Sequence, residues 1–231
     1  MFQAIDLSKS YNGHQALNNL TLEVNKGEVC CLLGQNGAGK TTTINLSLGF
    51  LRPTSGKVLI NDIEVSKNST ATRKMTAYIP EVVMLYSELT ALENLNYLSK
   101  LAGFSYSKEA LHAYLTEANL QQEAHAKRVG TFSKGMRQKV GIAIAISKQA
   151  DVILMDEPTS GLDPSATDEF SQIVKKLAEQ GKSILIATHD IFNAVNVSTK
   201  IGIMKAGKLL HVVKSKDITP DALQKLYLDT I

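Results

Sequence analysis

Short apolar runs separated by turn residues dominate the beginning and the end of the chain. They cover residues 2–8, 20–24, 29–33, 57–60, 76–79, 152–155, 183–187, 201–204 and 209–213. Turn residues at Asn12-Gly13 and at Lys205-Ala206-Gly207-Lys208 predict that the first two and the last two runs form antiparallel hairpins. The runs 29–33 and 152–155 contain no polar residue, which is typical of strands buried on both faces of a sheet.

The pattern changes at about residue 82, where helical periodicity replaces the short runs. The tetrapeptide Thr90-Ala91-Leu92-Glu93 has the spacing of a capping box and predicts a helix that ends at Gly103. The helix carries four leucines that we expect in the core: Leu92, Leu95, Leu98 and Leu101. A second helical pattern covers about 107–118. Residues 82 to about 132 are therefore predicted to be a helical insertion in an α/β chain.

The α/β pattern returns after about residue 148. Asp163 and Pro164 are suited to the N-cap and first position of a helix that ends at Gly181, and Thr219-Pro220 begins a last short helix. We therefore expect one domain over residues 1–231. Its α/β core with antiparallel strands covers about 1–81 and 149–231, and its helical part covers about 82–148.

One glycine-rich loop follows the apolar run 29–33 and precedes a predicted helix at 42–48. It reads Gly34-Gln35-Asn36-Gly37-Ala38-Gly39-Lys40-Thr41 and matches the phosphate-binding pattern G-x-x-x-x-G-K-[ST]. Backbone N–H groups of such a loop and the following helix N-terminus bind phosphate. Lys40 is expected to reach the β- and γ-phosphates of a nucleoside triphosphate, and the Thr41 hydroxyl to bind Mg²⁺. A chance glycine-rich turn is the alternative.

The amino-acid composition limits the classes of function that are compatible with this chain. The chain has 231 residues, 44% hydrophobic and 20% charged, which is typical of a soluble globular protein. A net charge of +3 is too small to argue for nucleic-acid binding. We expect no membrane span and no signal peptide. Cys30 and Cys31 lie in a predicted buried strand and are interpreted as small apolar residues in a reducing cytosol.

Polar residues follow two of the predicted buried strands. Asp156 and Glu157 come directly after the run 152–155, and His189 follows the run 183–187. Carboxyl ends of parallel strands meet at one edge of a sheet, where ligands of α/β folds bind. Asp156 suits a second contact to Mg²⁺, and Glu157 could act as the base that aligns water for phosphoryl transfer. A turn cap for the two carboxylates and a structural role for His189 are the alternatives.

Five motifs occur in the order found in ATP-binding cassette (ABC) ATPases, and the chain resembles that family over essentially its whole length. They resemble the Walker A, signature, Walker B, D-loop and switch-histidine motifs, which here are Gly34–Thr41, Phe132–Met136, Val152–Glu157, Ser160–Asp163 and His189. The resemblance implies a RecA-like P-loop NTPase core, an antiparallel β-subdomain and an inserted α-helical subdomain. It also implies a head-to-tail dimer, or a pseudo-dimer, in which each ATP lies between one P-loop and the partner's signature motif.

The resemblance also assigns roles to residues of this sequence. Lys40, Glu157 and His189 are the expected catalytic residues, and Thr41, Asp156 and Glu81 are the expected metal ligands. Tyr11 matches the aromatic residue that stacks on adenine, with packing beside the turn as the alternative. The expected nucleotide contacts are Tyr11, Gly34, Asn36, Gly37, Ala38, Gly39, Lys40, Thr41, Thr42, Ser133, Lys134, Gly135, Met136 and Asp163.

Two positions depart from the family pattern. The signature normally reads Leu-Ser-Gly-Gly-Gln but here has Lys134 and Met136, and the Q-loop position, normally Gln, is Glu81. Ser133 and Gly135 are retained, so the phosphate contact is expected to survive. Both departures resemble the exporter branch whose membrane subunits are of the ABC-2 type.

The leading hypothesis is therefore the ATPase subunit of an exporter, binding ATP and Mg²⁺ at the cytoplasmic face of the membrane. Because no membrane span is expected, a separate transmembrane permease subunit is required. An importer ATPase and a soluble ATPase acting on nucleic acid or ribosomes are the alternatives; no nucleic-acid partner is expected. Residues from Glu81 to about Gly103 match the cleft that receives the membrane subunit, and residues 82–86 are apolar for a loop. Burial of that loop in the core is the other interpretation.

Overall fold

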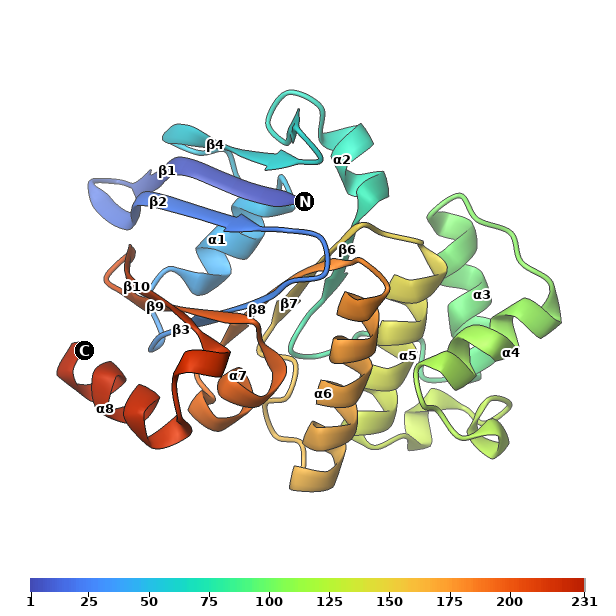
Figure 1. Cartoon of the computed structure of the whole chain (residues 1–231). Helices are drawn as coiled ribbons and strands as arrows, with labels where there is room; N and C mark the ends of the chain where they lie inside the picture. The colour runs from blue at the N-terminus through green and yellow to red at the C-terminus, as the bar shows by residue number, and fades with distance from the viewer. Residues whose placement is uncertain (231) are drawn as a thin grey trace.

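The computed structural model describes residues 1–230 and contains two sheets (Figure 1). The smaller sheet is antiparallel between its neighbouring strands, in the order β2-β1-β4-β5. Its strands are β1 (Phe2–Tyr11), β2 (His14–Val24), β4 (Ser55–Ile60) and β5 (Ile63–Glu64). Strands β1 and β2 are longer than the apolar runs predicted, because their pairing continues to Tyr11 and His14 at either side of the Asn12-Gly13 turn.

The larger sheet has six strands in the order β10-β9-β3-β8-β7-β6. These are β3 (Val29–Leu33), β6 (Thr76–Ile79), β7 (Val152–Asp156), β8 (Ser183–Thr188), β9 (Lys200–Lys205) and β10 (Lys208–Lys214). All neighbours are parallel except β9 and β10. In the register, Leu33 lies opposite Thr188 and Asp156 opposite Ala187, so β3, β7 and β8 end at one edge of the sheet. The residues that follow these strands therefore meet.

Apolar layers cover both faces of this sheet. Along β7, Val152 and Leu154 belong to the cluster shared with the smaller sheet and α1 (Lys40–Ser47), whereas Ile153 and Met155 belong to the cluster under the helices. Figure 1 shows α1 between the two sheets and α5 (Lys134–Ser147), α6 (Pro164–Glu179) and α7 (Ile191–Val197) on the opposite face. Burial of alternate residues on two faces explains why β7 is apolar at every position before Asp156.

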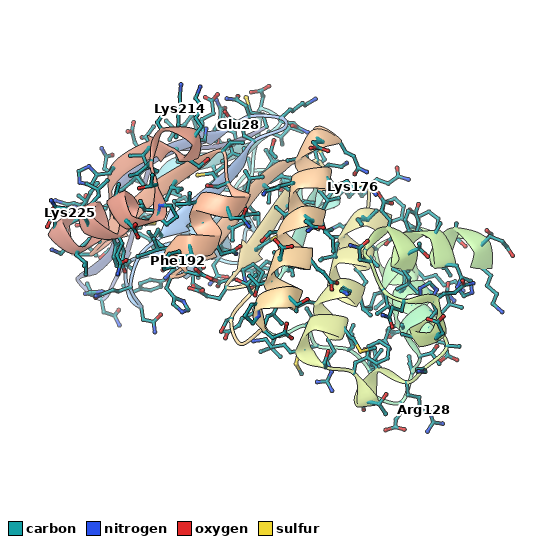
Figure 2. The ribbon with its side chains drawn as sticks, turned by 60° about the horizontal axis from the view of Figure 1, so that its bottom comes forward. Glu28, Arg128, Lys176, Phe192, Lys214 and Lys225 are labelled. Atoms are coloured by element: carbon teal, nitrogen blue, oxygen red, sulfur yellow. The ribbon has the colours of Figure 1, made fainter. Side chains whose placement is uncertain are left out.

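The predicted helical insertion forms one end of the molecule. It contains α3 (Ala91–Leu101), α4 (Lys108–Glu117) and two 3₁₀ turns, Gln122–Ala124 and Val129–Thr131. Helix α5 packs against α3, α4 and strand β6, and so joins this end to the larger sheet. Arg128 lies at the helical end, far from Glu28, Lys214 and Lys225 at the sheet end (Figure 2).

The predicted helix caps are present. Thr90 and Glu93 form the capping box of α3, and Asp163 accepts a hydrogen bond from the Ala166 N–H at the start of α6. The remaining elements are α2 (Ser69–Met75), α8 (Pro220–Thr230) and a 3₁₀ turn, Ser215–Asp217. The apolar pattern did not predict α2, since Thr72 is the only buried residue of this mostly polar helix. Within residues 1–230, no helix combines the length and apolar character of a membrane span.

The expectation that all four leucines of α3 belong to the core was wrong for Leu101, which is 66% exposed, whereas Leu95 is fully buried. Leucines spaced three residues apart advance about 300° per step, because each helical residue turns about 100°. Leu101 therefore lies about half a turn around the helix from Leu92. The buried face follows the spacing of Ala91, Asn94, Leu95 and Ser99 instead.

Candidate nucleotide-binding site

The glycine-rich loop connects β3 to α1 through backbone positions that accept no side chain. A Cβ on Gly34 would lie 2.6 Å from the Met204 carbonyl oxygen. Gly39 has a φ of +103°, and a Cβ there would lie 2.8 Å from the Ala16 carbonyl oxygen. The loop is therefore wrapped tightly between β9 and β2, and its helix begins at Lys40 with backbone N–H groups available to an anion.

Lys40 lies inside this loop and is only 5% exposed. Its Nζ donates hydrogen bonds to the carbonyl oxygens of Gly34 at 2.6 Å and Gln35 at 3.3 Å. Glu157 Oε1 lies 3.4 Å from the same Nζ. The ammonium is thus held among oxygen atoms at the position that a phosphate group would share.

Asp156 ends β7 beside the loop and is nearly buried. Its Oδ1 has no hydrogen-bond partner. Burial raises the pKa of the Asp156 carboxyl above its ordinary value, and the negative charges of Glu157 and Glu81 act in the same direction. The Thr41 hydroxyl and the Lys40 ammonium oppose this shift of the Asp156 pKa. A buried, unpaired carboxylate oxygen next to a threonine hydroxyl is suited to receive a cation.

Glu157 has a left-handed backbone with a φ of +45°. Its N–H donates to the Ala187 carbonyl oxygen at 2.8 Å, which continues the β7–β8 ladder by one residue. His189 Nδ1 lies 2.8 Å from Glu157 Oε2 and donates to it, because an ionised carboxylate can only accept. The turn therefore directs Glu157 between Lys40 and His189, and the predicted proximity of Glu157 and His189 is present.

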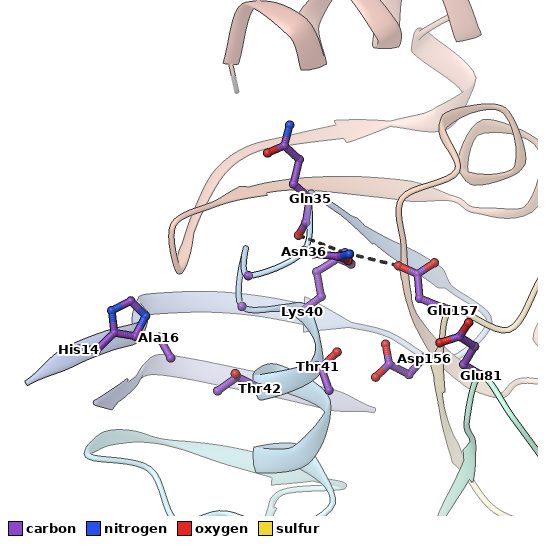
Figure 3. Close-up of a pocket in the computed structure, with 12 residues that line it drawn as sticks. His14, Ala16, Gln35, Asn36, Lys40, Thr41, Thr42, Glu81, Asp156 and Glu157 are labelled. Atoms are coloured by element: carbon purple, nitrogen blue, oxygen red, sulfur yellow. Dashed lines mark hydrogen bonds and ion pairs between the residues drawn. The ribbon is translucent and has the colours of Figure 1, made fainter. Parts of the chain in front are cut away.

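These residues border a cavity of about 300 Å³ at the edge of the larger sheet. In Figure 3, Glu81, Asp156 and Glu157 gather on one side of Lys40, while His14 and Ala16 lie on the other side of the loop. The full lining is His14, Ala16, Gln35, Asn36, Gly37, Gly39, Lys40, Thr41, Thr42, Glu81, Asp156 and Glu157. Half of the expected nucleotide and metal contacts thus line this cavity.

Tyr11 is not part of the cavity lining. Its ring is 41% exposed, and Lys9 Nζ lies 5.0 Å from the ring centroid while donating to the Arg52 carbonyl oxygen at 2.9 Å. His14 and Ala16 line the cavity, although the sequence reasoning did not single them out. The signal that could have found His14 was its cross-strand pairing with Tyr11 at the hairpin turn.

The signature residues lie outside the cavity, at the N-terminus of α5. Ser133 is the N-cap and accepts a hydrogen bond from the Met136 N–H at 3.2 Å. Gly135 lies against α6, where its added Cβ would be 3.4 Å from the Ala166 side chain. Ser133, Lys134, Gly135, Met136 and Asp163 are thus absent from the cavity lining among residues 1–230. Their expected contact with ATP stays a prediction.

The two departures from the family pattern lie close together. Glu81 Oε1 accepts a hydrogen bond from the Ser160 hydroxyl at 2.9 Å and is 3.9 Å from Lys134 Nζ. Glu81 follows β6, Ser160 lies between β7 and α6, and Lys134 is the first residue of α5. Three separate segments of the chain therefore converge at one carboxylate beside the cavity.

The residues around Asp156 fit Mg²⁺. Across residues 1–230, no three His, Cys, Asp or Glu side chains form a ready metal cluster. Mg²⁺ differs from zinc in this respect, since it commonly takes one or two carboxylates and completes its shell with water and substrate phosphates. The unpaired Asp156 Oδ1, the Thr41 hydroxyl and the nearby Glu81 provide the oxygen ligands that this ion prefers.

Comparison with known sequences gives an extended match. Residues 17–160 match the ABC transporter domain family. The chain is 36% identical over 214 residues to the bacitracin transport ATP-binding protein BcrA of Bacillus licheniformis, which covers 92% of this chain and 69% of that protein. It is 33% identical over 220 residues to the Nod factor export ATP-binding protein I of Cupriavidus metallidurans, which covers 94% of this chain and 72% of that protein.

Solved structures give the same picture. The ATP-binding subunit of an ABC transporter is 31% identical to this chain, with a TM-score of 0.86 and coverage of 99% of this chain and 98% of the other. A dimeric ATP-binding cassette in a post-hydrolysis state, bound to ADP and Pi, is 28% identical. Its TM-score is 0.83, with coverage of 93% of this chain and 99% of that one.

Proposed function

This chain belongs to the ABC transporter family as an ATP-binding, ATP-hydrolysing subunit, and we propose that it powers export through a separate membrane subunit. One observation carries the assignment of the chemistry. Lys40, which follows β3, and Asp156 and Glu157, at the end of β7, converge on one cavity at the N-terminus of α1. In this cavity a triphosphate would lie at Lys40, next to the carboxylates of Asp156 and Glu157.

We propose that Lys40 exchanges its contacts with the loop carbonyls for oxygens of the β- and γ-phosphates. Glu157 Oε2 then accepts a proton from the water that attacks the γ-phosphorus, as the bond between that phosphorus and the ADP oxygen breaks. His189 holds the Glu157 carboxylate through the Nδ1 contact of 2.8 Å, so it acts as a positioning residue as well as a polar group near the phosphate. Thr41, Asp156 and Glu81 would hold a Mg²⁺ ion, which would supply charge neutralisation for the phosphates.

The location of the signature motif supports a head-to-tail dimer. Ser133 and Gly135 are at the N-terminus of α5, whose N–H groups favour an anion, yet this N-terminus does not line the cavity of its own chain. A similar cassette is dimeric in its ADP-bound structure. In the proposed dimer, the α5 N-terminus of each chain completes the nucleotide site of the other.

Enzyme kinetics test this arrangement. The purified chain should hydrolyse ATP, and the rate per molecule should rise with protein concentration, because only dimers bring Ser133 to the partner's ATP. Ser133→Ala should lower the rate at every concentration. Ser107→Ala is the matched control, since Ser107 caps α4 through the Ala110 N–H and lies away from the cavity.

Two results would contradict the proposal in different ways. No ATP hydrolysis at any concentration would reject the ATPase assignment for this chain. Hydrolysis per molecule that does not change on dilution through the dimerisation range would reject the shared site alone. The isolated chain is required, because a preformed complex with a membrane subunit hides the effect of dilution.

The proposed contact with the membrane subunit is the segment 82–86 together with α3. Met84 is 82% exposed and Tyr86 51% exposed, whereas Val83 and Leu85 are partly buried against the core. A hollow of about 530 Å³ lies beside it, lined by Leu85, Tyr86, Ser87, Glu88, Leu89 and Tyr97. Tyr86 and Tyr97 meet edge to face, with ring centroids 5.2 Å apart. An apolar hollow with aromatic walls fits the side chains of a helix from a membrane protein.

The proposal that the chain serves an exporter rests on the names of its relatives and on the departures from the family pattern at Glu81 and Lys134. One relative carries export in its name, and the two departures resemble the branch paired with ABC-2 type membrane subunits. We place the chain at the cytoplasmic face of the membrane for the same reason.

A further inference from the structure

The two positions at which this chain departs from the family pattern form a pair in the structure. Lys134 Nζ lies 3.9 Å from Glu81 Oε1, and the Ser160 hydroxyl donates to the same oxygen at 2.9 Å. The family pattern has uncharged residues at both positions, so a positive charge and a negative charge have been introduced together. They come from distant segments of the chain and meet only in the folded state.

Lys134 occupies a position where its charge is unfavourable for the helix itself. It is the first residue of α5, and no acidic residue lies in the first turn. The N-terminus of a helix carries partial positive charge, so a lysine there is destabilising unless a nearby anion compensates it. Glu81 is the carboxylate that lies within reach. The Lys134 side chain also runs along Gly161, where an added Cβ would be 3.6 Å from Nζ.

Glu81 is similarly unfavourable for the site unless it is neutralised. It lines the nucleotide cavity with Asp156 and Glu157, and Figure 3 shows the three carboxylates on the same side of Lys40. Lys40 already contacts Glu157 at 3.4 Å. Without Mg²⁺, an additional uncompensated carboxylate would therefore repel the phosphates of ATP, because charges separated by less than about 8 Å interact appreciably at physiological salt.

We propose that Lys134 neutralises Glu81 within the same chain, and that this pair sets the affinity of the site for nucleotide. The inference rests on the proposed function of the cavity as an ATP site. It gives Lys134 a positioning role toward its own chain's site, in addition to any contact its helix makes with a partner. It also explains why Lys134 and Glu81 occur together in this sequence.

The pair predicts effects of opposite sign. Lys134→Met leaves the Glu81 charge uncompensated and should weaken nucleotide binding. Glu81→Gln leaves the Lys134 charge free near the phosphates and should strengthen it. The double variant should bind nearly as well as the wild type. Both side chains are partly exposed, at 35% and 51%, so solvent screens them and each single change should alter the affinity by about two- to fivefold.

The experiment is calorimetric titration of each variant with a non-hydrolysable ATP analogue in EDTA, at a chain concentration below the dimerisation range, because bound Mg²⁺ would itself compensate the Glu81 carboxylate. A parallel titration of the wild type contains MgCl₂. Low and high NaCl concentrations are compared, since an effect of charge decreases with salt. Lys139→Met and Glu169→Gln are matched controls, because they break another ion pair of α5, 2.6 Å long, outside the cavity lining. Thermal unfolding confirms that each variant is folded. The controls should leave nucleotide affinity unchanged.

The outcomes separate this inference from the proposed function. Opposite shifts for the single variants, recovery in the double variant and smaller shifts at high salt support the pair. Shifts of the same sign, additive losses in the double variant, or equal shifts in the Lys139 and Glu169 controls overturn it. A wild-type chain that binds no nucleotide analogue would instead overturn the proposed ATP site.

Discussion

Glu81 lines the nucleotide cavity, and the segment 82–86 follows it in the sequence. The two regions depart from the usual burial of side chains in opposite ways. At the cavity, charged groups are removed from water: Lys40 is 5% exposed, and buried oxygens of Asp156 and Glu157 lack hydrogen-bond partners. In the segment, an apolar group is left in water: Met84 is 82% exposed. Each arrangement is unfavourable in the isolated chain.

The difference indicates what each region binds. Buried carboxylate oxygens without hydrogen-bond partners and a buried ammonium are stabilised when a cation and an anion occupy the site, as Mg²⁺ and ATP do. Exposed apolar and aromatic side chains are stabilised when another protein covers them. Departures from local rules are expected at functional sites, and here the chemistry of each departure matches a different ligand.

The first prediction removes the exposed apolar side chains of the segment 82–86. Replacing both Met84 and Tyr86 with Ser should leave ATP binding and hydrolysis by the isolated chain unchanged, because neither residue lines the cavity. Co-purification with the membrane subunit and export should fall at least tenfold, since Met and Tyr provide the adaptable and aromatic contact area.

The control for that change is Phe50→Ser, an exposed aromatic residue outside both regions, 64% exposed. It should affect neither ATP hydrolysis nor export. A folded Met84/Tyr86 double variant that captures the membrane subunit normally and supports export would show that the segment is not the contact. Thermal unfolding of the double variant should match that of the wild type, because both side chains are exposed.

The second prediction concerns the outer edge of the cavity. Tyr11→Ala should weaken ATP and GTP binding alike by about 1–3 kcal/mol, because stacking on a ring depends little on base identity. Stacking requires Tyr11 to exchange its contact with Lys9 for the base. Nucleotide binding is measured by a fluorescence assay. Tyr97→Ala is the control, because Tyr97 has a similar exposure of 43%. Unchanged nucleotide affinity in Tyr11→Ala would assign this ring to packing beside the turn.

The third and smallest predicted effect is on stability. The raised pKa of Asp156 means that its carboxylate is less favourable in the folded chain than in the unfolded chain, so its stability contribution is lost as pH rises through the folded pKa. Asp156→Asn should therefore be more stable than the wild type at pH 7, without nucleotide or Mg²⁺. A gain of about 1 kcal/mol corresponds to a rise of about 2–4 °C in Tm.

Calorimetry at several pH values checks the sign. As pH falls through the pKa of Asp156, the difference in the free energy of unfolding between Asp156→Asn and the wild type should shrink. Over the same pH range the wild type should lose its Mg²⁺-dependent nucleotide binding. A lower Tm for the variant at pH 7 would mean that the carboxylate stabilises the empty cavity, contrary to its unpaired Oδ1.

Local patterns in the sequence were sufficient to predict the strands, most helices and the loop from Gly34 to Thr41. Apolar runs, cap residues and glycine spacing are short-range signals, and they placed Asp156, Glu157 and His189 at one sheet edge correctly. Exposure on α3 was harder to predict, because a leucine spacing of three drifts around the helix and left Leu101 in solvent.

Contacts between distant segments were not predictable in the same way. The sequence showed an unexplained charge at Lys134 and another at Glu81, but only the packing of α5 against β6 brings them to 3.9 Å. The placement of Lys9 over Tyr11, and of His14 in the cavity, likewise depends on the register of the β1–β2 hairpin. Such contacts depend on packing between segments that are distant in the sequence, and a local sequence pattern carries no information about that packing.

The central claim, that Glu157 is the base of an ATP-hydrolysing site, is tested most directly by Glu157→Gln. Binding of ATP and its hydrolysis are measured on the same purified protein, with Lys40→Ala as the variant expected to lose nucleotide binding. We predict that Glu157→Gln binds ATP normally and hydrolyses it at least 100-fold more slowly, because a general base contributes about 10²–10⁴ in rate. Hydrolysis by Glu157→Gln at close to the wild-type rate would contradict the account.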